Sequence, residues 1–203
     1  MKTNTALVRM ILAGLALMTV AVFANAQQAA QLEPSFDVAL QLVVGSNDGV
    51  RGEIPAELAG VTKQIKQSFG LNNYRLATTF IGRIANRGGF EYKSTSNIFG
   101  QESTGSTQTF LDWSLRDLQT MPTAGGRTGF RAESFRFGAR VPVLTSTASD
   151  GTGKSTPVFN YEPIGIALNR VGLTDGSPTL IGTLNLPGTS GTIFLIMTVR
   201  SAD

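Results

Sequence analysis

Two kinds of hydrophobic spacing alternate along the chain. Every second residue from Phe36 to Leu42 is apolar, which is the pattern of a strand with one buried face. Between Pro55 and Phe69 the apolar residues instead recur every three or four positions, as on one side of a helix. Pro55 suits the first turn of a helix, and Gly70 suits its end. We therefore predict a strand and then a helix whose buried stripe is Leu58, Val61, Ile65 and Phe69.

The strand pattern returns after the helix. Alternation resumes from Tyr74 to Phe80, and Gly88-Gly89 predicts a hairpin turn into a strand over 90–96. We therefore expect a small β-α-β-β module over 36–99. A Gly/Ser/Thr-rich join follows, and after it an antiparallel β-rich module over 107–203. The predicted fold class is α+β.

Two local patterns refine the second module. Phe130 and Phe135 belong to apolar sets of opposite parity, which predicts a bulge or a short break near Ser134. Ile193 to Val199 is apolar almost without interruption, the pattern of a strand that is covered on both faces. The alternative for this run is a surface that meets a partner protein or lipid.

The first 26 residues have the organisation of an export signal. Lys2 and Arg9 precede an apolar stretch over 10–23, and Ala24-Asn25-Ala26 supplies the small residues of a cleavage site. We predict a signal peptide over 1–26 and a polar tether over 27–35. The expected location is the bacterial periplasm or the outer membrane.

Composition narrows the chemistry. The chain of 203 residues contains no cysteine and no histidine, which excludes disulfides, zinc fingers and catalysis that depends on either residue. Charged residues make up only 15%, and Gly is abundant with 23 residues, as expected for strands and turns. Removing Lys2 and Arg9 with the leader lowers the formal net charge from +3 to +1. We predict no enzyme activity, no cofactor, no metal and no nucleic-acid partner.

Two motifs with catalytic associations have simpler interpretations. Ala148 to Ser155 matches a relaxed phosphate-binding loop, but the residues after Lys154 have a strand pattern where that loop requires a helix. A mobile hairpin tip is the better interpretation. A Ser–Lys hydrolase would need a desolvated lysine, and no lysine lies in an apolar context; the candidates are Lys63, Lys66, Lys93 and Lys154.

Arginines gather in the middle of the chain. Eight fall between Arg75 and Arg140. A basic face of this kind can dock an anionic polymer, lipid headgroups or an acidic protein patch. The alternative is a set of solvated strand edges whose charge prevents aggregation. The candidate docking face is Arg127, Arg131, Arg136 and Arg140.

The two segments 137–147 and 157–168 resemble the core of the secretin family, the ring-forming outer-membrane channels of bacterial secretion and pilus systems. The first segment has a Gly-x-x-Val-Pro strand that ends in Ser/Thr, and the second has a Tyr-x-x-x-Gly-Ile-x-Leu strand. The matching residues are Gly138, Val141, Pro142, Tyr161, Gly165, Ile166 and Leu168. The resemblance implies a hairpin, with the 36–99 module in the place of a secretin periplasmic domain.

These observations predict a non-enzymatic, secretin-like interaction or assembly module of the cell envelope, associated with a secretion or pilus apparatus. The expected partner is an envelope protein or another copy of the chain, joined through strand edges. Membrane contact is open, although no transmembrane helix is expected in the mature chain. The alternative is a carbohydrate- or peptidoglycan-binding module that stacks sugars on Trp113, Tyr92 and Tyr161.

Overall fold

Eight strands and one α-helix occur in the part of the chain that the structure, a computed structural model, describes. That part is residues 33–48, 52–97, 107–122, 128–149, 151, 153–187 and 191–202. The predicted signal peptide lies outside it, as does the predicted tether up to residue 32. Residues 34–203 form one unit. The elements are β1 (Ser35–Ser46), η2 (Ala56–Leu58), α2 (Ala59–Phe69), β2 (Asn73–Ala85), β3 (Gly89–Ser96), β4 (Thr109–Pro122), β5 (Thr128–Ser149), β6 (Ser155–Thr174), β7 (Thr179–Asn185) and β8 (Thr192–Ser201).

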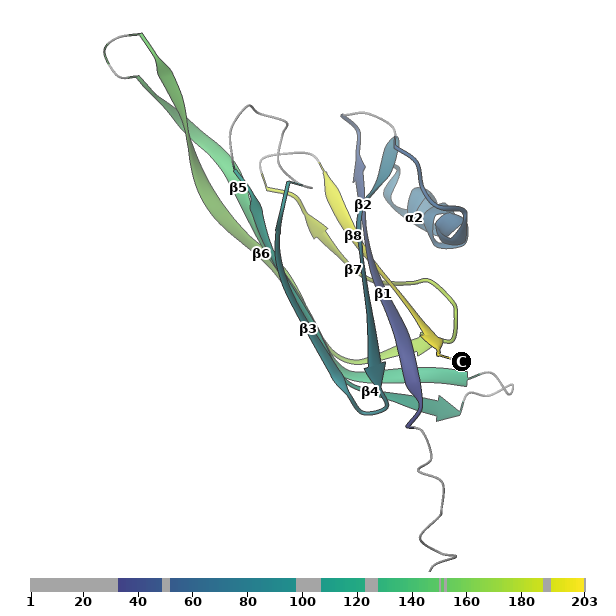
Figure 1. Cartoon of the computed structure of the whole chain (residues 1–203). Helices are drawn as coiled ribbons and strands as arrows, with labels where there is room; N and C mark the ends of the chain where they lie inside the picture. The colour runs from purple at the N-terminus through teal and green to yellow at the C-terminus, as the bar shows by residue number, and fades with distance from the viewer. Residues whose placement is uncertain are drawn as a thin grey trace, which may run out of the picture. The chain divides into compact units, whose positions relative to one another are not determined.

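The strands form two antiparallel sheets (Figure 1). Sheet A has the order β2-β1-β8-β7, and sheet B has the order β3-β4-β5-β6. A single hydrophobic core contains buried residues of both sheets, including Leu40 and Leu195 from sheet A and Trp113 and Phe135 from sheet B. The two sheets therefore pack against each other through their inner faces.

The apolar run near the C-terminus forms β8, a central strand of sheet A. Ile193, Leu195 and Met197 belong to the core between the sheets, whereas Phe194 and Ile196 belong to a second cluster with the helix. All five residues are fully buried. The prediction of a strand covered on both faces is confirmed, because successive side chains of a strand point to opposite sides.

Helix α2 covers the face of sheet A that does not pack against sheet B. Leu58, Val61 and Ile65 are buried against the outer face of sheet A, and Gly70 ends the helix with a left-handed φ of 62°. Figure 1 shows α2 on the side of sheet A away from sheet B. The helix predicted from Pro55 to Phe69 is therefore confirmed, since the single 3-10 turn η2 and α2 together span it. Its predicted buried stripe is wrong at Phe69, which lies at the helix end and is 43% exposed.

The expected β-α-β-β module does not close on itself. β1 pairs with β8 from the far end of the chain, and β3 pairs with β4, so each sheet combines strands from 36–99 and from 107–203. β2 and β3 lie in different sheets, and the predicted hairpin at Gly88-Gly89 is a link between sheets. The physical reason is side-chain packing: Phe80 of β2 and Tyr92 of β3 face each other with ring centroids 4.7 Å apart. The fold is mostly antiparallel β-sheet with one short helix.

In three long strands of sheet B, the alternation of buried and exposed residues shifts by one position at the same row of the sheet. We describe this shift as a change of the buried side. Asp117 of β4, Glu133 of β5 and Arg170 of β6 lie at one level in the strand register. Ala132 and Phe135 are both buried although they are three positions apart, whereas a regular strand buries every second residue. Asp117 and Arg170 have left-handed φ angles of 51° and 58°. The irregularity predicted for this point of β5 is present, and it extends across the sheet.

Candidate functional site

The residues that carry the secretin resemblance lie on one ladder. β5 and β6 pair along their whole length, and Gly138 lies opposite Gly165 while Pro142 lies opposite Tyr161. The ladder continues to the pair Ser149–Ser155, so the segment between these serines connects two paired strands. β5 and β6 are therefore the two arms of a hairpin, and residues 150 and 152 of the predicted tip lie outside the described residues. The phosphate-loop interpretation fails because β6 begins at Ser155, where a helix would be needed. The other residues of the set, Val141, Ile166 and Leu168, lie on the same two strands and turn toward the core.

Both glycines of the pair Gly138–Gly165 lie close to other atoms, but only at Gly165 is the neighbour a backbone atom that cannot move aside. A Cβ atom on Gly138 would lie 2.7 Å from Oδ1 of Asp112, and one on Gly165 would lie 2.8 Å from the carbonyl oxygen of Phe137. Pro142 is tolerated for a different reason. Among the described residues, β4 pairs with β5 only as far as Arg140, so at Pro142 only β6 lies beside the strand.

Three of the four residues of the predicted basic face lie in the described part of the chain. Arg136 and Arg140 are exposed and alternate with buried residues of β5, so both point away from the core on the outer face of sheet B. Arg131 is half-buried and lies beyond the row at Glu133 where the buried side changes. Arg127 lies outside the described residues. Arg136 and Arg140 therefore share the outer face of sheet B, and Arg131, which lies between the buried residues Phe130 and Ala132, faces the same side.

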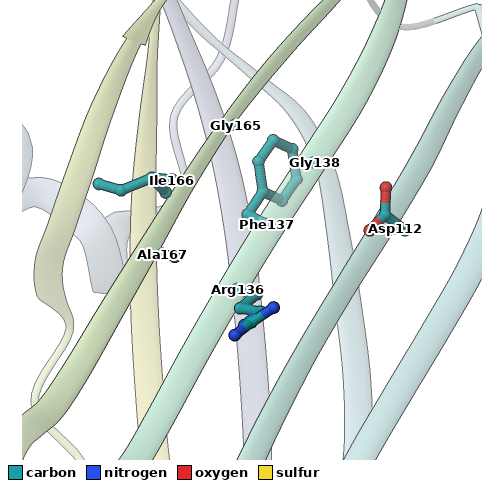
Figure 2. Close-up of a pocket in the computed structure, with 7 residues that line it drawn as sticks. All are labelled: Asp112, Arg136, Phe137, Gly138, Gly165, Ile166 and Ala167. Carbon is teal, nitrogen blue, oxygen red and sulfur yellow. The ribbon is translucent and has the colours of Figure 1, made fainter.

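The outer face of sheet B contains a shallow depression of about 380 Å³ beside Arg136. Its floor includes Gly138, Gly165 and Ala167, three residues with little or no side chain, which we call the shelf. Asp112 on β4 and Arg136 on β5 lie beside it (Figure 2). Within the described residues, neither Asp112 nor Arg136 takes part in an ion pair.

An ion pair on β3 lies next to Asp112 in the sheet. Lys93 lies opposite Asp112, and its ammonium is 2.9 Å from the Glu91 carboxylate. The hydrogen bond lowers the pKa of Glu91 and raises the pKa of Lys93. A catalytic lysine base needs the opposite shift. Lys63 and Lys66 are exposed on α2.

Exposed aromatic rings extend the site along the same face. Phe110 of β4 and Tyr161 of β6 are 49% and 39% exposed, and their ring centroids are 5.5 Å apart. Phe110 lies opposite Arg140 and two residues from Asp112. The sequence reasoning missed Phe110 and Asp112. A Phe at an outward position of the alternating strand 109–115 was the signal that could have found the first.

The other two aromatic residues proposed to stack on sugars are not at the surface. Trp113 is 1% exposed, with its ring 4.8 Å from that of Phe90 in the core. Tyr92 is half-buried and packs against Phe80. Tyr161 alone of the three is exposed. Among the described residues, no group of three or more acidic side chains is arranged to hold a metal ion. Their one α-helix is too short and too polar to cross a membrane.

Comparisons with known proteins find likeness only in structure. No family model and no curated protein matches the chain. Solved structures that match include the Klebsiella pneumoniae type II secretion system outer membrane complex of PulD, PulS and the PulC HR domain, at 11% identity and a TM-score of 0.37. The V. cholerae type IV competence pilus secretin PilQ matches at 12% identity and a TM-score of 0.36. The Salmonella type III secretion injectisome secretin InvG matches at 10% identity and a TM-score of 0.28.

The chain is shorter than the proteins it matches. These matches cover 92%, 91% and 93% of this chain. They cover only 43% and 65% of the Klebsiella and V. cholerae chains, and 70% of the Salmonella chain. Identities and TM-scores this low do not establish that the chain belongs to the secretin family.

Proposed function

We propose that this chain is an exported, non-enzymatic assembly module of the bacterial envelope that works with a secretion or pilus apparatus. It joins an envelope protein or another copy of itself by pairing strand edges. The single observation that carries the proposal is the pair of open edges of sheet B, at β3 and β6. Within the described residues, β3 pairs only with β4, and β6 pairs only with β5.

An open edge presents unpaired backbone N–H and C=O groups, which can hydrogen-bond to a strand of a second molecule. The edges of sheet B differ from each other. β3 spans eight residues without proline, whereas β6 contains Pro157 and Pro163. Proline lacks the N–H donor, so it weakens pairing where it lies. The stretch of β6 from Ile164 to Thr174 is free of proline and is the longer open edge available for pairing.

Pairing between unlike edges extends a sheet from one copy to the next. Because β3 and β6 are the two ends of the order β3-β4-β5-β6, β3 of one copy can join β6 of the next copy. Such a head-to-tail contact repeats, and it closes into a ring when the rotation between copies permits. The motif residues Gly165, Ile166 and Leu168 lie on the β6 stretch that this contact uses.

The absence of cysteine in the chain makes a disulfide test clean. We would combine Lys93→Cys on β3 with Ala167→Cys or Asn169→Cys on β6, so that the two pairs sample the register. Within one copy, two strands separate β3 from β6, which is too far for a disulfide. We expect one pair to give a ladder of cross-linked species on a non-reducing gel.

The matched control replaces the β6 position with the exposed Lys63→Cys on α2. Light scattering of the unmodified protein, with and without envelope extract, gives the state in solution. A strict monomer that retains no partner, with cross-linking no greater than in the control pair, would overturn the proposal.

A further inference from the structure

The outer face of sheet B has properties that strand pairing does not use. The shelf of Gly138, Gly165 and Ala167 leaves the backbone of two strands almost bare. In the described residues, no helix covers this face, in contrast to α2 on sheet A. The depression is open to solvent, so the shelf offers a ligand a broad backbone surface to lie on instead of an enclosing pocket.

The exposed rings at one end of the shelf favour a ligand with a flat C–H face. The rings of Phe110 and Tyr161 contact each other, and their planes are inclined at 56°. A ligand therefore meets two ring faces that point in different directions. The face of an aromatic ring carries negative charge density, which attracts weakly polarised C–H groups. Sugar rings present such C–H faces and carry hydroxyls around their edge.

The polar groups on this face are both acceptors and donors. The Asp112 carboxylate accepts hydrogen bonds, while Arg136 and Arg140 donate them in a fork that matches a carboxylate. A purely anionic surface, such as a lipid bilayer or nucleic acid, would meet the charge of Asp112 at the centre of the site. A ligand with hydroxyls as well as carboxylates satisfies both kinds of group.

We infer that the outer face of sheet B binds an acidic oligosaccharide, a linear glycan with carboxylates on its sugar rings. The rings of Phe110 and Tyr161 stack on one sugar, and Asp112 accepts hydrogen bonds from hydroxyls at the shelf. Arg136 and Arg140 bind the carboxylates. Phe110 and Asp112 are two residues apart on β4, a step of about 6.6 Å, so the site is longer than one sugar ring.

Titration calorimetry of the full chain with oligogalacturonate tests this site. We expect oligogalacturonate to bind more tightly than galacturonic acid and than a neutral oligomer of N-acetylglucosamine. Phe110→Ala should weaken binding by about threefold to tenfold, from the loss of an aromatic contact. Arg136→Gln should weaken it by about threefold, the size of an exposed charge pair.

The controls separate the site from general effects. Ile81→Ala and Arg200→Gln remove an exposed apolar and an exposed basic side chain from sheet A, and both should leave binding unchanged. Phe110→Leu keeps an apolar side chain, so a loss of binding without a loss of stability identifies the ring as the cause.

Three results would overturn the inference. They are no measurable binding of oligogalacturonate, equal weakening by Arg136→Gln and Arg200→Gln, and equally tight binding of polyglutamate or anionic phospholipid vesicles. The disulfide test of edge pairing uses β3 and β6 edges and no glycan, so either proposal can fail while the other holds.

Discussion

The two sheets differ in how many of their faces are covered. In sheet A, the neighbouring residues Phe194 and Leu195 of β8 are both 0% exposed, because α2 covers one face and sheet B the other. In sheet B, Trp113 of β4 is 1% exposed but Phe110 is 49% exposed. Sheet A is therefore covered on both faces at its central strand β8, whereas sheet B keeps its outer face for solvent or a ligand. A stability effect and a binding effect should therefore separate between the sheets.

The largest effect compares the same residue type on the two sheets. Phe194→Ala removes a fully buried ring that contacts Phe69 and Tyr74, and we expect a loss of about 3–5 kcal/mol in the free energy of unfolding. Phe110→Ala removes a half-exposed ring, and it should change that free energy by about 0.5 kcal/mol or less. Urea unfolding followed by circular dichroism measures both. Equal losses would show that the outer face of sheet B is covered after all.

The next prediction concerns two glycines of β6. Gly165→Val places a side chain against the Phe137 carbonyl oxygen, and we expect a loss of about 1–3 kcal/mol, as for other overpacked sites. Gly172→Ala is the matched control in the same strand, since nothing lies within 4 Å of a Cβ atom there. Its effect should be within about 0.5 kcal/mol. Thermal unfolding compares the two, and a stable Gly165→Val would mean that β5 and β6 can separate at this pair.

The sequence predicted the elements of sheet A better than those of sheet B. The continuous run from Ile193 to Val199 and the helical stripe from Leu58 to Phe69 each identified an element, because their periodicity is set by local geometry. The stripe was wrong only at Phe69, which is 43% exposed. Alternation does not say which strand lies beside which. For that reason the pairing of β1 with β8 and the separation of β2 from β3 were not foreseen. A Gly-Gly turn is compatible with a hairpin and with a link between sheets.

The candidate site also contains two kinds of residues: those that a local sequence pattern identified, and those that depend on which strands lie side by side. Tyr161, Gly138 and Gly165 were identified from a motif within one hairpin, where partners are close in sequence. Asp112 and Phe110 join the site only because β4 lies beside β5, which the motif does not contain. Arg131 was grouped with Arg136 by spacing alone. Regular alternation would place two residues five positions apart on opposite faces. The shift of alternation at the row of Glu133 instead places both on the outer face, and local periodicity did not show that this shift crosses three strands.

That row gives the third prediction, which tests what bends sheet B. Arg170 has a left-handed φ of 58°, and its guanidinium is 3.9 Å from the carboxylate of Glu133. Arg170→Val should destabilise the fold by about 1–2 kcal/mol, because a branched side chain is strained in this conformation. Arg170→Gly loses the same exposed ion pair without the strain, so it should be close to neutral. Denaturant unfolding of both variants decides between them, and equal losses would assign the effect to the ion pair.

The smallest effect concerns exposed charges, where the two sheets should behave alike. Arg83 donates two hydrogen bonds to Asp37 on the uncovered part of sheet A, at 2.7 and 3.0 Å, and these lower the pKa of Asp37. Because the folded-state pKa is lowered, the stabilisation is present above the ordinary carboxyl pKa and is lost as the pH falls through the lowered value. Both side chains are well exposed, so water and salt screen the pair.

Arg83→Gln should return the pKa of Asp37 toward its ordinary value, while the pKa of Glu91 on sheet B stays low because Lys93 still binds it. Lys93→Gln should do the reverse. Carboxyl chemical shifts followed by NMR across the acidic range measure each residue separately, and added salt should shrink both shifts. If Arg83→Gln left Asp37 unchanged, the low pKa would come from the sheet around Asp37. The two sheets would then differ in their electrostatics as well as in their cover.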